Sequence, residues 1–437
     1  MDIAPLFPPL EEADAGLSAL ARGVIGSEIL RIAAEIRALK AQGAAICNLT
    51  VGDFDPAYFP IPAELLDGTR AALVEGHTNY PPSDGVLALR QAVVRFYERE
   101  LGLSYPIDSV LIAGGARPLL YASYLTLLDP GDVAIYPVPS WNNNHYAYLS
   151  GARAVALPVS AATNFFPTAE QIRPHLPGAR LLTLNSPLNP TGTVIDPDEL
   201  RRIAELVVEE NGRRRSRRER PLWFVFDQVY WTLTFGGVKH TTPVELVPEV
   251  APYTLLLDAL SKAVCATGMR VGWGLMPPAV RRRMADVLGH VGAWAPKAEQ
   301  VAAAALLDAP ETLRAYQATM KGKVKERLDA LYGGFAAMAS EGLPVEVIAP
   351  QGAIYLSVRF DLCGRTVGGR TLATNDDIRR LLLEVGGLAV VPFQAFGLTG
   401  DTGWFRLSVG AVSMDDIRAV LPRLRDLLAS HATAPSR

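Results

Sequence analysis

The sequence predicts an α/β protein with a large, mainly parallel sheet and a second, smaller α+β domain. Between about residues 60 and 300, short apolar strands alternate with helices, as at 110–113 and 117–128. Such strands are apolar throughout because helices cover both faces of a parallel sheet. In the last third of the chain, the segments 352–360 and 404–409 indicate strands of a second sheet. Further strands of the large sheet are expected at 133–136, 181–184, 222–226 and 254–257, with a helix at 197–210.

The length of the chain also indicates two domains. A single hydrophobic core stops growing near roughly 250–300 residues, and this chain has 437. We expect an irregular arm at residues 1–24 and a large domain at residues 60–300. Residues 25–59 and 301–437 should together form the small domain, whose first helix is expected to follow Ser27.

Composition and charge exclude several classes of protein. The formal net charge is −3, so no overall positive field attracts nucleic acid or an acidic membrane surface. The basic run from Arg213 to Arg220 is interpreted as a solvated surface loop. Three scattered cysteines favour a reducing compartment and give no thiolate metal site, so we expect no metal. Without a signal peptide or an apolar run of about 20 residues, the sequence predicts a cytoplasmic protein with no membrane partner.

Polar residues that could carry chemistry follow three of the predicted strands. Lys262 comes just after the strand at 254–257, and Asp227 comes directly after the strand at 222–226. The turn at 185–192 follows the strand at 181–184. Each feature has an ordinary alternative: a solvated lysine, an acid that caps a helix, and a tight turn rich in turn-forming residues. In parallel sheets, however, ligands bind beyond the carboxyl ends of the strands, which is where these residues lie.

The order and spacing of these residues resemble a known family. From about Gly26 to Leu428, the sequence resembles the class I/II aminotransferases of pyridoxal-5′-phosphate (PLP) fold type I, the family of aspartate and aromatic aminotransferases. The most specific segments are the turn Asn189-Pro-Thr-Gly192 and the pair Ser261-Lys262. The others are Tyr80-Pro-Pro-Ser-Asp-Gly85, Gly114-Gly115-Ala116, Trp141, Asp227 with Tyr230, Gly268-Met-Arg270 and Phe405-Arg406-Leu-Ser408.

The resemblance implies PLP as the cofactor and assigns roles around its ring. Lys262 would supply the amine for a Schiff base with the cofactor. An anionic Asp227 would keep the pyridine nitrogen protonated, which makes the ring an effective electron sink. Tyr230 and Asn189 would bond to the phenolic oxygen. Trp141 would stack on the ring, unless it is an ordinary core tryptophan.

The resemblance also implies a site for the phosphate group and a dimer. The glycine pair before Ala116 lies between a strand and a helix, where free backbone N–H groups attract anions. Arg270 would add a guanidinium and Ser261 a hydroxyl. A tyrosine that matches Tyr80 reaches the phosphate from the neighbouring subunit, which implies a homodimer with shared active sites. Tyr80 could alternatively pack on its own subunit.

Arg406 resembles the arginine that binds the substrate α-carboxylate through two parallel hydrogen bonds, although a surface ion pair is its ordinary alternative. Gly52 resembles the residue whose backbone also contacts that carboxylate. Two positions depart from the pattern of the family. Ala259 stands where a phosphate-binding serine is common, and Arg117 stands where small polar residues are common. Arg117 could lie near the phosphate or point to solvent.

The implied function is ping-pong transamination between an L-amino acid and a 2-oxo acid, with Lys262 as general base. A β-elimination lyase or a decarboxylase could use the same residues. A regulatory protein with an aminotransferase-like sensor domain would need a DNA-binding domain ahead of the fold. The substrate side chain stays open. A second carboxylate could meet Lys297 or Arg22, whereas an aromatic or apolar side chain could meet Phe54, Tyr58, Trp141, Phe393 or Phe396.

Overall fold

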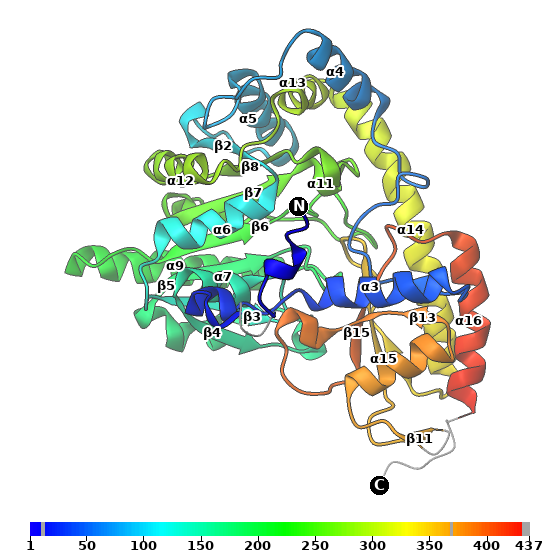
Figure 1. Cartoon of the computed structure of the whole chain (residues 1–437). Coiled ribbons are helices and arrows are strands. Elements are labelled where there is room, and N and C mark those ends of the chain that lie inside the picture. Colours follow the sequence, from blue (N-terminus) through cyan, green and yellow to red (C-terminus); the bar gives the residue numbers. More distant parts are fainter. Residues whose placement is uncertain (10–13, 368–369, 431–437) are drawn as a thin grey trace.

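A central sheet of seven strands organises the protein (Figure 1). The structure, a computed structural model, describes residues 1–9, 14–367 and 370–430. The strand order is β2-β8-β7-β6-β5-β3-β4. The pairs β4-β3, β3-β5, β5-β6 and β6-β7 are parallel, whereas β8 is antiparallel to both β2 and β7. The predicted, mainly parallel large sheet is thus confirmed, with β2 Val110–Ala113, β3 Val133–Val138, β4 Arg153–Pro158, β5 Ala179–Asn185, β6 Trp223–Asp227, β7 Thr254–Ala259 and β8 Gly272–Leu275.

Side chains alternate between the two faces of this sheet and contact different helices. On one face, Val225 and Leu257 belong to a core that includes Leu119 of α6. On the other face, Phe224 belongs to a core that includes Ile203 of α9. This alternation follows from the two-residue period of a strand, and it explains why both neighbours in the sequence are apolar. Helices α6 Ala116–Leu127 and α12 Pro278–Val291 cover the first face, and α5 Leu87–Leu101, α9 Pro197–Arg217 and α13 Lys297–Leu307 contribute to the second core.

A second, antiparallel sheet lies beside the first, with the strand order β14-β15-β10-β9. It has its own hydrophobic core, which includes Leu356 and Leu407. Helix α14 places Leu313 in the core of the large sheet and Leu328 in that of the second sheet, so it connects the two parts. Figure 1 shows α14 running from the top of the molecule down to α16. The bounds are β9 Val345–Val347, β10 Tyr355–Phe360, β14 Val391–Pro392, β15 Trp404–Ser408, α14 Pro310–Ser340, α15 Asn375–Glu384 and α16 Met414–Ala429.

The segment before the large sheet packs against elements of the C-terminal part, where Glu35 pairs with Arg379 of α15. Helix α3 begins after Ser27, as predicted, and buries Ile32 and Ile36. The strand β1 that follows it pairs in parallel with β13. We keep the boundaries between the large and the small domain, near residues 60 and 300, as a proposal. The remaining elements are α2 Ala19–Arg22, α3 Glu28–Ala41, β1 Cys47–Asn48, α4 Ala63–Val74, α7 Asn143–Ser150, α8 Ala169–Ile172, α10 Pro243–Leu246, α11 Leu260–Ala263, β11 Thr366–Val367, β12 Arg370–Thr371 and β13 Leu388–Ala389, with 3-10 helices at Ala4–Leu6, Ile107–Ser109, Ala161–Thr163, Arg173–Gly178, Pro248–Tyr253, Thr267–Met269 and Phe393–Phe396.

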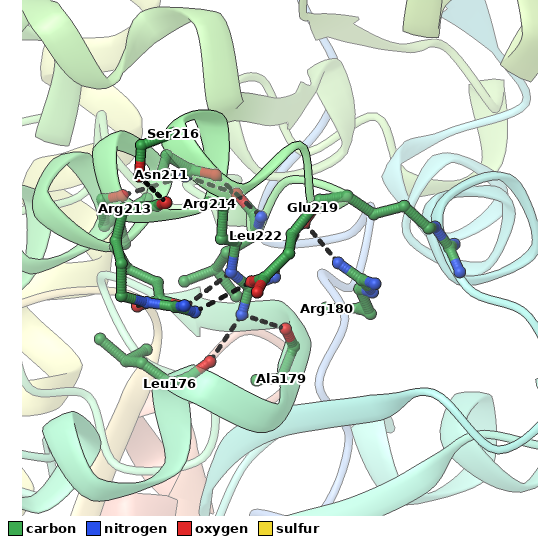
Figure 2. Close-up of polar contacts among 12 residues, drawn as sticks. Leu176, Ala179, Arg180, Asn211, Arg213, Arg214, Ser216, Glu219 and Leu222 are labelled. Atoms are coloured by element: carbon green, nitrogen blue, oxygen red, sulfur yellow. Dashed lines mark hydrogen bonds and ion pairs between the residues drawn. The ribbon is translucent and has the colours of Figure 1, made fainter.

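The basic run at residues 213–220 is not a simple surface loop, which corrects the prediction. Helix α9 continues to Arg217, and the side chain of Arg214 is only 2% exposed. Its Nε donates to Glu210 at 2.6 Å, and its Nη2 donates to the carbonyl oxygens of Leu176 and Ala179 (Figure 2). A buried guanidinium is tolerated only with such partners. Arg214 therefore fastens the end of α9 to the segment that enters β5.

Within the described ranges, no helix is long and apolar enough to cross a membrane. The same residues contain no group of three or more His, Cys, Asp or Glu side chains that could hold a metal ion. All three cysteines are free.

Candidate active site

A cavity of about 740 Å³ lies where the carboxyl ends of β5, β6 and β7 face the second sheet. Asp227 reaches it from the end of β6, and Lys262 from α11, directly after β7. Arg406 reaches it from β15 of the second sheet. The structure thus brings together residues that lie far apart in the sequence. Other predicted site residues that line the cavity are Gly52, Ala116, Trp141, Asn189, Tyr230, Ser261 and Arg270.

Lys262 is a buried amine with little to hold its charge. Its side chain is enclosed between the rings of Phe54 and Tyr230, and Nζ donates to the carbonyl oxygen of Gly52 at 2.7 Å. Burial disfavours the ammonium and lowers the pKa of Lys262 to about 8. A larger fraction of the amine is therefore neutral near neutral pH than for an exposed lysine. A neutral amine can act as a nucleophile or as a base.

Asp227 is a buried acid without a cationic partner. Its Oδ1 accepts from the backbone N–H of Val229 at 3.1 Å. Within the described part of the chain, no lysine or arginine forms an ion pair with it, and burial raises its pKa to about 6. A buried carboxylate of this kind is stabilised by a cation that enters the cavity. The protonated ring nitrogen of the expected cofactor fits that requirement.

Arg406 is the opposite case, a buried guanidinium without a carboxylate. It is 1% exposed, and burial lowers its pKa. Its Nη1 donates to Asn189 Oδ1 at 3.1 Å and its Nη2 to the Thr50 carbonyl at 2.6 Å, whereas Nε has no partner among the described residues. A Cβ at Gly52 would lie 2.9 Å from the Tyr355 hydroxyl oxygen and 3.4 Å from Arg406 Nη1, so glycine keeps this space open. The free space and the unused donor fit a substrate carboxylate.

Tyr355 is a site residue that was not predicted from the sequence. Its hydroxyl group lies 2.6 Å from that of Tyr230, and its ring lies 4.8 Å from the Arg406 guanidinium. It lies on β10, which pairs with the strand of Arg406. The segment was correctly predicted as a strand, but only this pairing places Tyr355 in the cavity.

The turn at Asn189–Gly192 is fitted tightly against β10. Gly192 has φ +72°, and a Cβ there would lie 2.1 Å from the Tyr355 carbonyl oxygen. The Gly352 N–H donates to the Gly192 carbonyl at 2.9 Å, and Ser357 Oγ donates to the Thr191 carbonyl at 2.8 Å. We call this contact the seam. It fixes Asn189 beside Arg406.

The start of α6 forms a cradle for an anion. Gly115 precedes the helix with φ +97°, and a Cβ there would lie 2.5 Å from Arg270 Nη2. Arg270 donates to the carbonyl oxygens of Thr267 and Gly114 at 2.6 and 2.7 Å. No side chain caps the free N–H groups of α6. The predicted phosphate-binding residues Gly114, Gly115, Ala116 and Arg270 therefore converge, and Ser261 is buried nearby in the cavity.

Other predicted residues lie outside the cavity. Tyr80 is 81% exposed, and its ring packs edge-on against Trp294. Lys297 donates to Asn79 at 2.6 Å and does not line the cavity. The suggested pocket residues Arg22, Phe54, Tyr58, Phe393 and Phe396 do not line it either, whereas Arg117 and the α3 residues Ile29, Leu30, Ala33 and Arg37 do.

Comparisons with known proteins agree with this geometry. The profile of the family "Aminotransferase class I and II" matches residues 45–424. An aspartate aminotransferase of Rhizobium meliloti (strain 1021) is 30% identical over 405 residues, which cover 91% of this chain and 92% of the relative. One of Geobacillus stearothermophilus is 29% identical over 93% of this chain and 97% of its own length.

A solved structure of aspartate aminotransferase from Thermus thermophilus with maleate superposes with a TM-score of 0.83. It is 27% identical in sequence, and the match covers 94% of this chain and all of that one. The likeness therefore extends over the large sheet, the second sheet and the cavity between them. The chain belongs to the class I and II aminotransferases and is a pyridoxal-phosphate-dependent enzyme that transfers amino groups.

Proposed function

We propose that transamination takes place in the cavity between the two sheets, with Lys262, Asp227 and Tyr230 as catalytic residues. The observation that carries this proposal is a set of three buried ionisable groups that form no ion pair with any residue that the structure describes. An amine, an acid and a guanidinium, those of Lys262, Asp227 and Arg406, face one space. A buried charge on any of these groups is unfavourable without a partner. Each group matches one charged or reactive group of PLP or of an amino acid.

The residues of the cavity fit PLP as a whole. Lys262 would hold its aldehyde carbon, Asp227 its ring nitrogen, and Tyr230 and Asn189 its phenolic oxygen. Trp141 would cover the ring. The start of α6, Ser261 and Arg270 would hold the phosphate, and Tyr80 would come from a second subunit. When bound, PLP withdraws electrons from the substrate Cα and makes its proton labile.

The residues of the chain would then handle the substrate and its proton. Arg406 binds the α-carboxylate, which orients the Cα–H bond toward Lys262. The neutral Nζ of Lys262 would accept the Cα proton and would then donate it to the former aldehyde carbon of the cofactor. Tyr230, whose hydroxyl group lies 2.6 Å from that of Tyr355, would present that hydroxyl group to the phenolic oxygen of PLP. Donor and acceptor acids use the same groups in turn, which is the physical basis of a ping-pong cycle.

We further propose that the substrates include dicarboxylic amino acids. The relatives are named aspartate aminotransferases. The cavity also holds Arg37, an exposed residue of α3 that has no ion-pair partner among the described residues. A guanidinium at the mouth of the cavity suits the second carboxylate of aspartate or glutamate.

A panel of amino donors tests the function and the role of Arg406 together. We expect aspartate and glutamate to react with 2-oxo acids at a higher kcat/KM than leucine or phenylalanine. Arg406→Lys should lower kcat/KM for every donor together, by about 10-fold to 10²-fold, because the paired hydrogen bonds to the carboxylate are lost. Steady-state rates measure both effects. Loss with one donor alone would place Arg406 at the substrate side chain.

We also propose that the chain acts as a homodimer, in the cytoplasm. Tyr80 and the apolar side chains of Leu73 and Val74 on α4 are exposed, and a second copy related by two-fold symmetry would cover such a surface. Tyr80 would then reach the partner's phosphate group.

Complementation between two inactive variants tests the shared site. The variants Tyr80→Arg and Lys262→Ala should each have little activity. When they are mixed under conditions of subunit exchange, one of the two active sites in each mixed dimer should receive a wild-type Tyr80 and a wild-type Lys262 and regain activity. Activity after exchange measures this. A single-chain mass at micromolar concentration would contradict the proposal.

A further inference from the structure

Arg117 occupies a position where a cation is electrostatically unfavourable. It is the second residue of α6, a helix of 12 residues whose first turn contains no acidic side chain. The N-terminal end of a helix carries a partial positive charge, so cations are normally found at the opposite end. The N-cap, Gly115, offers no side chain to balance this charge. An anion bound at the start of α6 would reverse the sign of the interaction.

Nothing in the described chain neutralises Arg117. Its guanidinium lies 5.2 Å from the centre of the Trp141 ring, and it forms no ion pair with a carboxylate among the described residues. Arg117 lines the same cavity as Arg270 and Lys262. Burial, and next the charge of Arg117, lower the pKa of Arg270. Arg117 and Arg270 therefore repel each other, and an anion bound beside them would relieve that repulsion. The carboxylates that line the cavity are Asp53, whose charge raises the pKa of Arg270, and Asp227.

The same end of the cavity is short of hydroxyl groups. Ala259, three residues before Lys262, ends β7 without a hydroxyl, and Ala116 opens α6 without one. Ser261 and Thr267 present hydroxyl groups in the cavity, and the Thr267 hydroxyl already donates to Asp53. A phosphate dianion bound here would otherwise depend on backbone N–H groups, Ser261, Arg270 and the partner subunit's Tyr80. A second guanidinium would supply the missing donors.

We propose that Arg117 binds the phosphate group of the cofactor beside Arg270 and, through its stacking on Trp141, fixes the indole that covers the cofactor ring. This inference rests on the assignment of the cavity proposed above. Arg117 suits the phosphate better than a second substrate carboxylate because it belongs to the helix that forms the cradle. Arg37, which also lines the cavity, belongs to α3 and forms no part of that cradle.

The experiment compares cofactor binding in Arg117→Gln with a matched control, Arg37→Gln, which removes the same charge from the same cavity. Binding of PLP and of pyridoxal, which lacks the phosphate, is measured by fluorescence titration. The phosphorus-31 resonance of the holoenzyme is recorded as well. We expect Arg117→Gln to raise the Kd for PLP by about 10-fold or more and to shift the resonance. The Kd for pyridoxal should rise far less, because only the contact with Trp141 affects it, and Arg37→Gln should leave both affinities unchanged. Arg117→Lys should restore part of the PLP affinity.

Three results would overturn the inference. An unchanged Kd for PLP with a higher KM for aspartate would place Arg117 on the substrate. An equal loss of PLP and pyridoxal would mean that Arg117 acts on Trp141 alone. If Arg270→Gln also leaves PLP affinity unchanged, the proposed cavity itself is wrong, whereas a loss in Arg270→Gln alone rejects only the role of Arg117.

Discussion

Lys262→Ala is expected to lower kcat by about 10⁴-fold or more, because the variant lacks the group that moves the Cα proton. Lys262 combines burial, a lowered pKa and a place in the same cavity as Asp227 and Arg406. Steady-state transamination measures the loss. In the wild-type enzyme, borohydride treatment followed by peptide mapping should find a stable cofactor label on Lys262.

A suitable control is Lys325→Ala, since Lys325 lies on the exposed side of α14 in an ion pair with Asp329. It should keep wild-type activity within a factor of about two, as surface substitutions generally do. Recovery of the borohydride label on another lysine would reject the assignment of the whole site.

The second large effect is expected for Asp227→Ala, which should lower kcat by about 10³-fold, or several kcal/mol of transition-state stabilisation. Asp227 is the buried acid whose negative charge matches a protonated ring nitrogen. Its loss leaves that nitrogen without a counter-charge, so the ring withdraws electrons less effectively. The variant should still bind PLP, because the phosphate cradle is intact. Single-turnover rates with bound cofactor separate the two effects.

The chain offers a matched comparison in a second buried acid, Asp258. Its carboxylate accepts hydrogen bonds from Trp231 Nε1 at 2.7 Å and from the Tyr97 hydroxyl at 3.1 Å, and it does not line the cavity. Asp258→Asn removes a charge close to Asp227 without removing the proposed partner of the ring. Its kcat should therefore fall far less. Equal losses in the two variants would show that Asp227 is only structural.

Much of the fold follows from local patterns in the sequence. The apolar run at 222–226 predicts a strand buried on both faces, and the structure places Phe224 and Val225 in two different cores. The site residues at strand ends follow from the same reasoning, because the carboxyl ends of parallel strands share one edge. Lys262 and Asp227 thus lie in one cavity.

Other features depend on contacts between distant segments. Tyr355 is an ordinary strand residue in the sequence, and only the pairing of β10 with β15 brings it to Tyr230. The α3 side of the cavity, with Leu30, depends on how that helix packs against distant elements such as α15, through the Glu35–Arg379 ion pair. The sequence shows only that Arg214 is charged and lies in a basic run, so it was assigned to a solvated surface loop. Its partners include carbonyl oxygens of residues more than 30 positions away, which no local pattern indicates.

The seam has a consequence for the route by which substrates arrive. Its backbone hydrogen bonds and the contact of Gly192 with β10 hold the turn directly against the second sheet. The wall that carries Asn189 and Arg406 therefore cannot open without breaking them. On the α3 side, Leu30 is 68% exposed at the edge of the cavity, while Glu35 of α3 pairs with Arg379 of α15 at 3.0 Å. Substrates and products are therefore expected to pass the exposed α3 edge of the cavity rather than the seam.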